Sequence, residues 1–94
     1  MNTLTGIVKW WDKRKGYGYI TVALNGAVQD YFAHYANIES SHKFKKLKEG
    51  WVCEFVPEKS EKGWMATGIH VVARDSKDFP NLKETDEWLQ NNEY

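Results

Sequence analysis

Residues 15–20 read Lys-Gly-Tyr-Gly-Tyr-Ile, so two tyrosines alternate with two glycines directly after a basic residue. Side chains two apart on an extended backbone point to the same face of a sheet, which places Tyr17 and Tyr19 together. The glycines remove side-chain bulk around them. A second aromatic run, residues 30–35 (Asp-Tyr-Phe-Ala-His-Tyr), follows one turn later and can pair with the first as a hairpin. Together the two runs predict a sheet face on which unpaired nucleic-acid bases stack.

The composition is that of one small domain. The chain has 94 residues, of which 15% are aromatic, more than a core of this size needs, so some rings are expected on the surface. The single cysteine, Cys53, has no partner for an internal disulfide. No apolar run reaches membrane-spanning length, and the N-terminus lacks a signal-peptide pattern. These features predict a reducing, cytoplasmic setting and no association with a membrane.

The net charge of zero conceals an asymmetry along the chain. Residues 1–73 carry ten Lys or Arg and seven Asp or Glu, a balance of +3, whereas residues 74–94 carry three and six, a balance of −3. Charges act within a Debye length of about 8–10 Å, so a neutral total does not exclude a polyanionic ligand. We therefore divide the chain into a mildly basic body, residues 1–73, and an acidic C-terminal extension, residues 74–94.

Five segments have the β-branched and aromatic composition of short strands, with turn residues between them. They are residues 3–12, 17–24, 28–35, 51–56 and 64–72. Asn25-Gly26 predicts a tight hairpin turn, and Pro57 is expected to end the fourth strand because proline cannot donate to a sheet ladder. Five short strands at regular intervals predict an all-β, closed or nearly closed antiparallel barrel.

Alternation along the strands assigns the residues that face inward. The expected core is Val8, Ile20, Val22, Ala33, Ile38, Cys53, Phe55, Ile69 and Val71. Thr21 falls on the outer face with the two tyrosines. The first strand does not divide cleanly into two faces, and a β-bulge or sharp bend near Gly6 would reconcile its pattern.

The acidic extension contains apolar residues at uneven spacings, among them Phe79, Leu82, Trp88 and Leu89. The pattern is compatible with one short amphipathic helix that begins near Pro80, or with a disordered acidic tail. Three roles stay open for it: a solvated extension, a competitor with nucleic acid for the basic face, or a docking segment for a protein partner or a homodimer.

Four segments resemble a cold-shock domain, a five-stranded OB-type barrel that binds single-stranded RNA or DNA, and they occur in the family's order and spacing. They are residues 6–11, 15–20, 31–35 and 44–50, within a resemblance that covers residues 6–72. The resemblance places nucleic-acid-binding side chains at Lys9, Trp10, Lys15, Tyr17, Tyr19, Phe32, His34, Tyr35 and Phe44. The chain departs from the family in its tyrosines, where phenylalanines are more usual, in Trp11 and in residues 64–65.

Each of these residues also has a structural interpretation. The rings could pack a barrel core, but the inward-facing residues already supply one, which favours stacking. Phosphates could be neutralised by Lys9, Lys13, Arg14, Lys15, Lys43, Lys45 and Lys46. Lys9 and Lys15 are favoured because they lie beside the rings, whereas solvated lysines are the commoner explanation for the others. Trp51 and Trp64 either extend the aromatic surface or pack beneath the extension.

No catalytic, metal or cofactor site is predicted. The histidines and Cys53 lack metal-ligand spacing, and no Ser-His-Asp set, carboxylate pair or phosphate-binding glycine loop is present. We expect a protein that is not an enzyme and binds single-stranded RNA or DNA with low sequence specificity, as an RNA chaperone or a single-stranded DNA-binding protein. The alternative is a protein-interaction or dimerisation module that uses the exposed aromatic patch.

Overall fold

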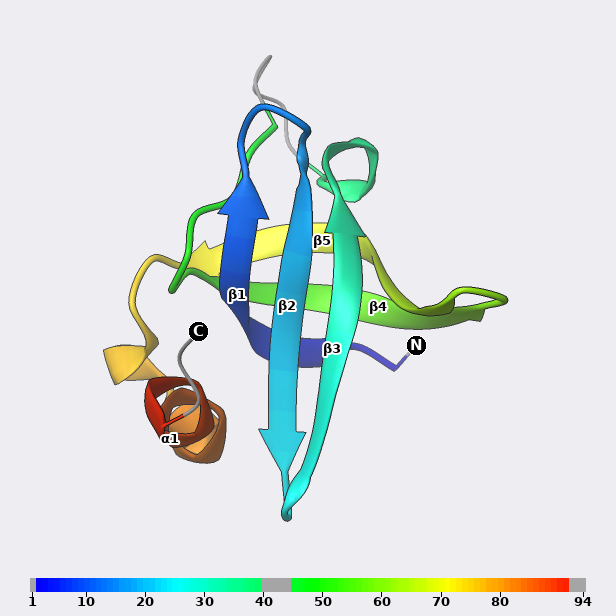
Figure 1. Cartoon of the computed structure of the whole chain (residues 1–94). Helices are drawn as coiled ribbons and strands as arrows, with labels where there is room; N and C mark the ends of the chain where they lie inside the picture. The colour runs from blue at the N-terminus through cyan, green and yellow to red at the C-terminus, as the bar shows by residue number, and fades with distance from the viewer. Residues whose placement is uncertain (1, 40–44, 92–94) are drawn as a thin grey trace.

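The computed structural model describes residues 2–39 and 45–91, which form a closed five-stranded barrel with a C-terminal helix (Figure 1). The strands are β1 Leu4–Asp12, β2 Tyr17–Leu24, β3 Ala27–His34, β4 Val52–Ser60 and β5 Gly63–Ala73. Their order around the barrel is β1-β2-β3-β5-β4. The pair β3 and β5 is parallel, and the other neighbours are antiparallel. The predicted OB-type barrel is confirmed.

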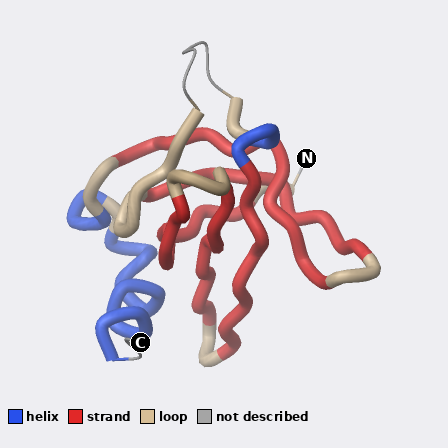
Figure 2. The backbone as a smooth tube through the Cα atoms, turned by 45° about the horizontal axis from the view of Figure 1, so that its top comes forward, coloured by secondary structure: helices blue, strands red, loops and turns tan. Residues whose placement is uncertain are grey.

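Two hairpins extend from the barrel (Figure 2). Asn25 and Gly26 join β2 to β3 with φ angles of 53° and 82°, the left-handed conformation of the predicted tight turn. A turn at Glu61 and Lys62 joins β4 to β5. Because β3 pairs with β5, the aromatic strands and the β4–β5 hairpin belong to one continuous sheet.

The prediction that Pro57 ends the fourth strand is wrong. β4 continues through Pro57 to Ser60, and Pro57 lies opposite Ala66 of β5. Pairing between β4 and β1 stops at Phe55, so beyond that residue one edge of β4 is open. Proline is tolerated at an open edge because no ladder bond is required from its missing N–H there.

The barrel encloses most of the predicted core. At most 3% of the surface is exposed at Val8, Ile20, Ala33, Ile38, Cys53, Phe55 and Ile69, and burial raises the pKa of the Cys53 thiol to about 12. Val22 is partly buried against this core. Val71 is a correction, since it is 37% exposed. The register between β4 and β5 shifts on both sides of Val71, between its partner Cys53 and Val52 and between Glu54 and Val56, so the regular alternation used to place Val71 inside does not hold along this part of β5.

The β-bulge of β1 lies at Lys9 and not near Gly6. The residues opposite Val8 and Trp10 are consecutive on β2, so Lys9 is the extra residue. This bulge allows Val8 to face the core while Trp10 stays half-exposed on the outside. Gly6 instead pairs in register with Cys53, and its lack of a side chain permits close packing against β2.

The acidic extension folds onto the barrel beside β1 and β2 (Figure 1). It forms the short helices η2 Ser76–Asp78 and η3 Pro80–Leu82 and the helix α1 Lys83–Asn91. The helix expected near Pro80 is therefore confirmed, and the alternative of a disordered tail does not hold for the described part of the extension. None of the described helices is long and apolar enough to cross a membrane.

A second apolar cluster joins the extension to the barrel. Leu82 is 4% exposed and packs with Ile7 of β1 and Val52 of β4. Phe79 and Leu89 pack around this cluster. The barrel thus buries Leu82 and partly buries Phe79 and Leu89, while a protein partner or a homodimer through residues 74–94 stays a prediction.

Polar contacts fix α1 at the end of the β2–β3 hairpin. The buried Thr85 hydroxyl accepts a hydrogen bond from the N–H of Ala23 and donates one to its carbonyl, both at 3.1 Å. The Glu84 carboxylate accepts from the N–H groups of Asn25 and Gly26 at 2.8 and 2.6 Å. The helix therefore satisfies backbone groups at the end of β2 and in the turn.

Thr85→Ala is expected to lower the free energy of unfolding by about 1–3 kcal/mol, because it leaves the buried N–H and carbonyl of Ala23 without a partner. Urea denaturation followed by tryptophan fluorescence measures the change. Thr85→Ser keeps the hydroxyl and should lose less. A Thr85→Ala protein as stable as the wild type would contradict the docking of α1.

Candidate nucleic-acid interface

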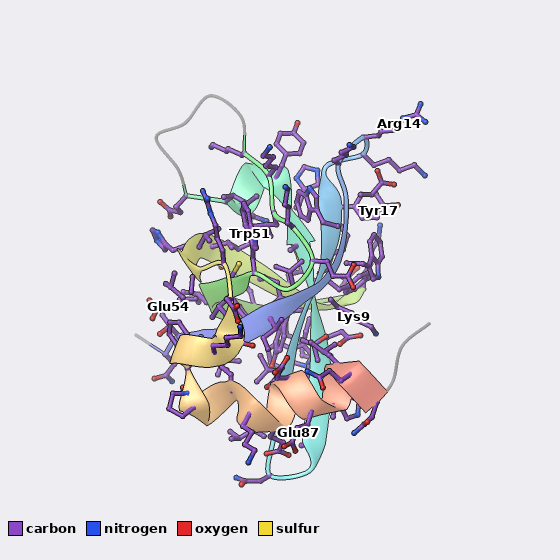
Figure 3. The ribbon with its side chains drawn as sticks, turned by 90° about the vertical axis from the view of Figure 1, so that its left-hand side faces the viewer. Lys9, Arg14, Tyr17, Trp51, Glu54 and Glu87 are labelled. Atoms are coloured by element: carbon purple, nitrogen blue, oxygen red, sulfur yellow. The ribbon has the colours of Figure 1, made fainter. Side chains whose placement is uncertain are left out.

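Five rings lie together on the outer face of β1, β2 and β3. They are Trp10, Tyr17, Tyr19, Phe32 and His34, and we call them the aromatic platform. Tyr17 pairs with His34, and Tyr19 pairs with Phe32 on one side and Trp10 on the other, so the rings form two rows across the strands. All five residues are partly exposed. In Figure 3, Tyr17 projects from this face on the right-hand side of the view.

Neighbouring rings of the platform contact one another at an angle. The centroids of Trp10 are 5.9 Å from Tyr17 and 5.5 Å from Tyr19, and those of Phe32 are 5.6 and 5.7 Å from the same two rings. The interplanar angles range from 38° to 70°, so the rings do not stack face to face on each other. The rings brace one another and leave faces open to a flat ligand.

Two glycines make this packing possible. A Cβ on Gly18 would overlap the carbonyl oxygen of Trp10 and lie 2.9 Å from the Cα of Trp11, so only glycine allows β1 and β2 to approach here. Gly16 has a φ of 74°, and a Cβ on it would lie 2.6 Å from the ring of Tyr35. The alternation of glycine and tyrosine therefore serves close backbone packing as well as the exposed face.

Tyr35 extends the platform beyond His34, at the end of β3. The Nδ1 atom of His34 accepts a hydrogen bond from the N–H of Ala36 at 3.2 Å, which makes Nε2 the protonated nitrogen of the neutral ring. The ring centroids of His34 and Tyr35 are 4.5 Å apart, and Tyr35 is 48% exposed. Phe44, the other aromatic residue predicted for this site, lies outside the described residues.

The turn between β1 and β2 presents cations beside the platform. Lys13, Arg14 and Lys15 are exposed, and Figure 3 shows Arg14 extending into solvent. The Asp12 carboxylate accepts the N–H groups of Lys15 and Arg14 at 3.0 and 2.9 Å, and the bond from Lys15 is the main cause that lowers the Asp12 pKa. The turn is thus held by hydrogen bonds from backbone N–H groups to the Asp12 carboxylate, and none of its three cations forms a salt bridge with a described residue.

A shallow groove of about 390 Å³ extends the platform toward the β4–β5 hairpin. Tyr19 and Phe32 line one side, and Lys62, Trp64 and Met65 line the other. Of the two interpretations of Trp64, the structure supports an extension of the aromatic surface. Lys62 was not predicted, because its nearness to Phe32 depends on the closure of the barrel between β3 and β5.

Lys9 is placed differently from the other predicted residues. Its ammonium lies 2.8 Å from Oδ2 of Asp30, and its side chain is only 13% exposed. The same ammonium lies 5.7 Å from the ring centroid of Trp88 in α1. Lys9 was expected to offer a cation to the ligand, whereas in the structure it is engaged by two side chains of the protein.

Trp51 lies away from the platform. It packs against the barrel core, and the guanidinium carbon of Arg74 is 5.3 Å from its ring centroid. It lines a separate groove of about 530 Å³ that also contains Lys45 and Lys46. Of its two interpretations, packing beneath the start of the extension describes Trp51 better.

The described residues offer rings and cations rather than metal ligands. Within residues 2–39 and 45–91, no group of three or more His, Cys, Asp or Glu side chains could hold a metal ion. The platform, the basic turn and the groove at Trp64 form one surface that suits flat bases joined by a charged backbone.

Comparisons with known proteins bear on the same residues. The family model of the 'cold-shock' DNA-binding domain matches residues 4–73. A cold shock-like protein of Thermotoga maritima is 45% identical over 69 residues, which cover 73% of this chain and 98% of that protein. The cold shock protein CapA of Pseudomonas fragi is 47% identical, over 66% of this chain and 92% of that protein. The cold shock-like protein CspA of Bordetella pertussis is 41% identical, over 72% and 97%.

Gly18→Ala is expected to destabilise the fold by about 1–3 kcal/mol, because the added methyl group forces β1 away from β2. The free energy of unfolding in urea measures this cost. Gln29→Ala, an exposed change on β3, serves as the control and should alter stability by less than about 0.5 kcal/mol. Equal stability of Gly18→Ala and wild type would be incompatible with the close approach of the two strands.

Proposed function

Because this chain belongs to the cold-shock domain family, a family of nucleic-acid-binding domains, we propose that it binds single-stranded RNA or DNA on the aromatic platform. The observation that supports this most directly is the set of partly exposed rings in mutual contact beside three exposed cations. Stacking of a base on such a ring contributes about 1–3 kcal/mol. Several stacked bases therefore suffice for stable binding.

The proposed contacts divide into stacking and charge neutralisation. Stacking is assigned to Trp10, Tyr17, Tyr19, Phe32, His34 and Tyr35, and the family resemblance adds Phe44. Phosphates are neutralised by Lys15, with Lys13 and Arg14 beside it. Every base has a π face, so binding by stacking has little sequence specificity. No reaction and no cofactor are part of this proposal.

The groove beside the platform suggests the path that the bound strand takes across the surface. From the basic turn the strand crosses the two rows of rings and reaches Trp64 and Lys62 on the β4–β5 hairpin. The tyrosine hydroxyls add hydrogen-bond donors and acceptors along this path without removing the stacking surface. A strand bound in this way is held unpaired, because its bases face the protein.

Two cellular roles share this mechanism. Holding RNA unpaired opposes the re-formation of hairpins, which is the action of an RNA chaperone. Coating single-stranded DNA uses the same contacts. We propose that the protein acts in the cytoplasm in one of these roles.

Phe32→Ala should weaken binding of oligo-dT by about 1–3 kcal/mol, a roughly 5- to 150-fold rise in Kd, because it removes a ring from the centre of the platform. Quenching of tryptophan fluorescence measures the affinity. Leu24→Ala, which changes an exposed apolar residue on the far end of the same sheet, should leave the Kd unchanged.

Wild-type binding should also weaken as salt rises, since the lysine contacts release counterions from the strand. Titrations with matched single-stranded DNA, single-stranded RNA and duplex should show quenching by the single strands and little by the duplex. Absence of quenching by any homopolymer at low salt would overturn the proposal. It would favour a protein-interaction or dimerisation module, which sedimentation of the free protein would then test.

A further inference from the structure

The aromatic platform ends at an ion pair between strands. Below the row of Trp10, Tyr19 and Phe32, the next cross-strand pair on the same face of the sheet is Thr21 and Asp30. The Thr21 hydroxyl donates to Oδ1 of Asp30 at 2.7 Å, and the Lys9 ammonium donates to Oδ2 at 2.8 Å. Both carboxylate oxygens of Asp30 are therefore occupied by groups of the protein.

The other neighbour of Lys9 comes from α1. The ring centroid of Trp88 lies 5.7 Å from the Lys9 ammonium, within the range of a cation–π interaction. The position of the helix is set by Thr85 on Ala23 and by Glu84 on the hairpin turn. In Figure 3, Lys9 lies on the same side of the molecule as Tyr17, with α1 directly below it.

We propose that α1, acting through Trp88, and Asp30 together withhold Lys9 from the ligand, so that the binding site ends at the Trp10–Tyr19–Phe32 row. This inference rests on the proposed function. Moving Lys9 onto a phosphate would leave the partly buried Asp30 carboxylate without its cation, and breaking such a pair is costly. A phosphate in the solvent-exposed site offers a weaker, salt-screened partner in exchange. The ion pair therefore persists when nucleic acid binds.

The consequence depends on a segment outside the family match. The family match ends at residue 73, and Trp88 lies in the segment beyond it. The acidic extension thus lowers by one the number of lysines on the barrel that can contact a ligand, and it does not cover the aromatic rings.

The test is the dependence of the oligo-dT Kd on salt for matched variants. Each phosphate contact adds about 0.7 to the slope of log K against log salt for a single strand. Lys15→Gln, which removes a proposed phosphate contact, should lower the magnitude of the slope by about 0.7. Lys9→Gln should leave the slope at the wild-type value, because it removes no phosphate contact. Asp30→Asn should release Lys9, raising the magnitude of the slope by about 0.7 and tightening binding about threefold or more at low salt.

Two further variants control for charge. Glu87→Gln removes one negative charge from an exposed position of α1 whose carboxylate lies 4.0 Å from Lys83, and it should leave the slope unchanged. Lys9→Gln combined with Asp30→Asn should return the slope to the wild-type value, because the released lysine is then absent. Thermal melting of each protein verifies that it is folded, and Lys9→Gln alone remains decisive where Asp30→Asn does not fold.

The outcomes separate this inference from the function on which it rests. A wild-type protein that does not bind oligo-dT or oligo-U overturns both. A wild-type protein that binds, with a slope that falls in Lys9→Gln as it does in Lys15→Gln, overturns only the withholding of Lys9. An equal increase of slope in Asp30→Asn and Glu87→Gln does the same, because general electrostatics would then explain it.

Discussion

The extra residue at Lys9 is the constraint on which both surfaces of the β1–β3 sheet depend. In a regular strand, Val8 and Trp10 would share a face, so either the indole would enter the core or the valine would lie in solvent. The bulge separates them, and Val8 is 1% exposed while Trp10 contacts Tyr17 and Tyr19 on the outside. The core and the aromatic platform are therefore consequences of one irregularity in the pairing of β1 with β2.

Features that depend on neighbouring residues in the chain could be predicted from the sequence. Tyr17 and Tyr19 share a face because of backbone geometry alone, and Asn25-Gly26 forms the expected turn because these residues tolerate positive φ. Features that depend on distant neighbours could not. The tolerance of Pro57 depends on where β1 begins, and the state of Lys9 depends on Asp30 and on Trp88, almost eighty residues away in the chain.

The C-terminal extension shows how composition can mislead about solvation. Its excess of acidic residues is typical of a solvated tail, and charge alone gives no reason for it to dock. A few side chains nevertheless dock the extension on the barrel, since Leu82 and Thr85 are almost fully buried. One of the acidic residues, Glu84, serves as an acceptor for two backbone N–H groups and not as a free charge. Hydrogen-bonding capacity, which net charge does not measure, explains its place.

The bonds from Glu84 to the β2–β3 turn also bear on the order of folding. They join residues 59 and 58 positions apart, among the longest-range contacts that the chain makes, whereas the turn itself closes a loop of a few residues. The entropy of closing a loop grows with its length, and the acceptor has no site until the hairpin has formed. We therefore expect the barrel to act as the template for the extension, with helix docking in the last stage of folding.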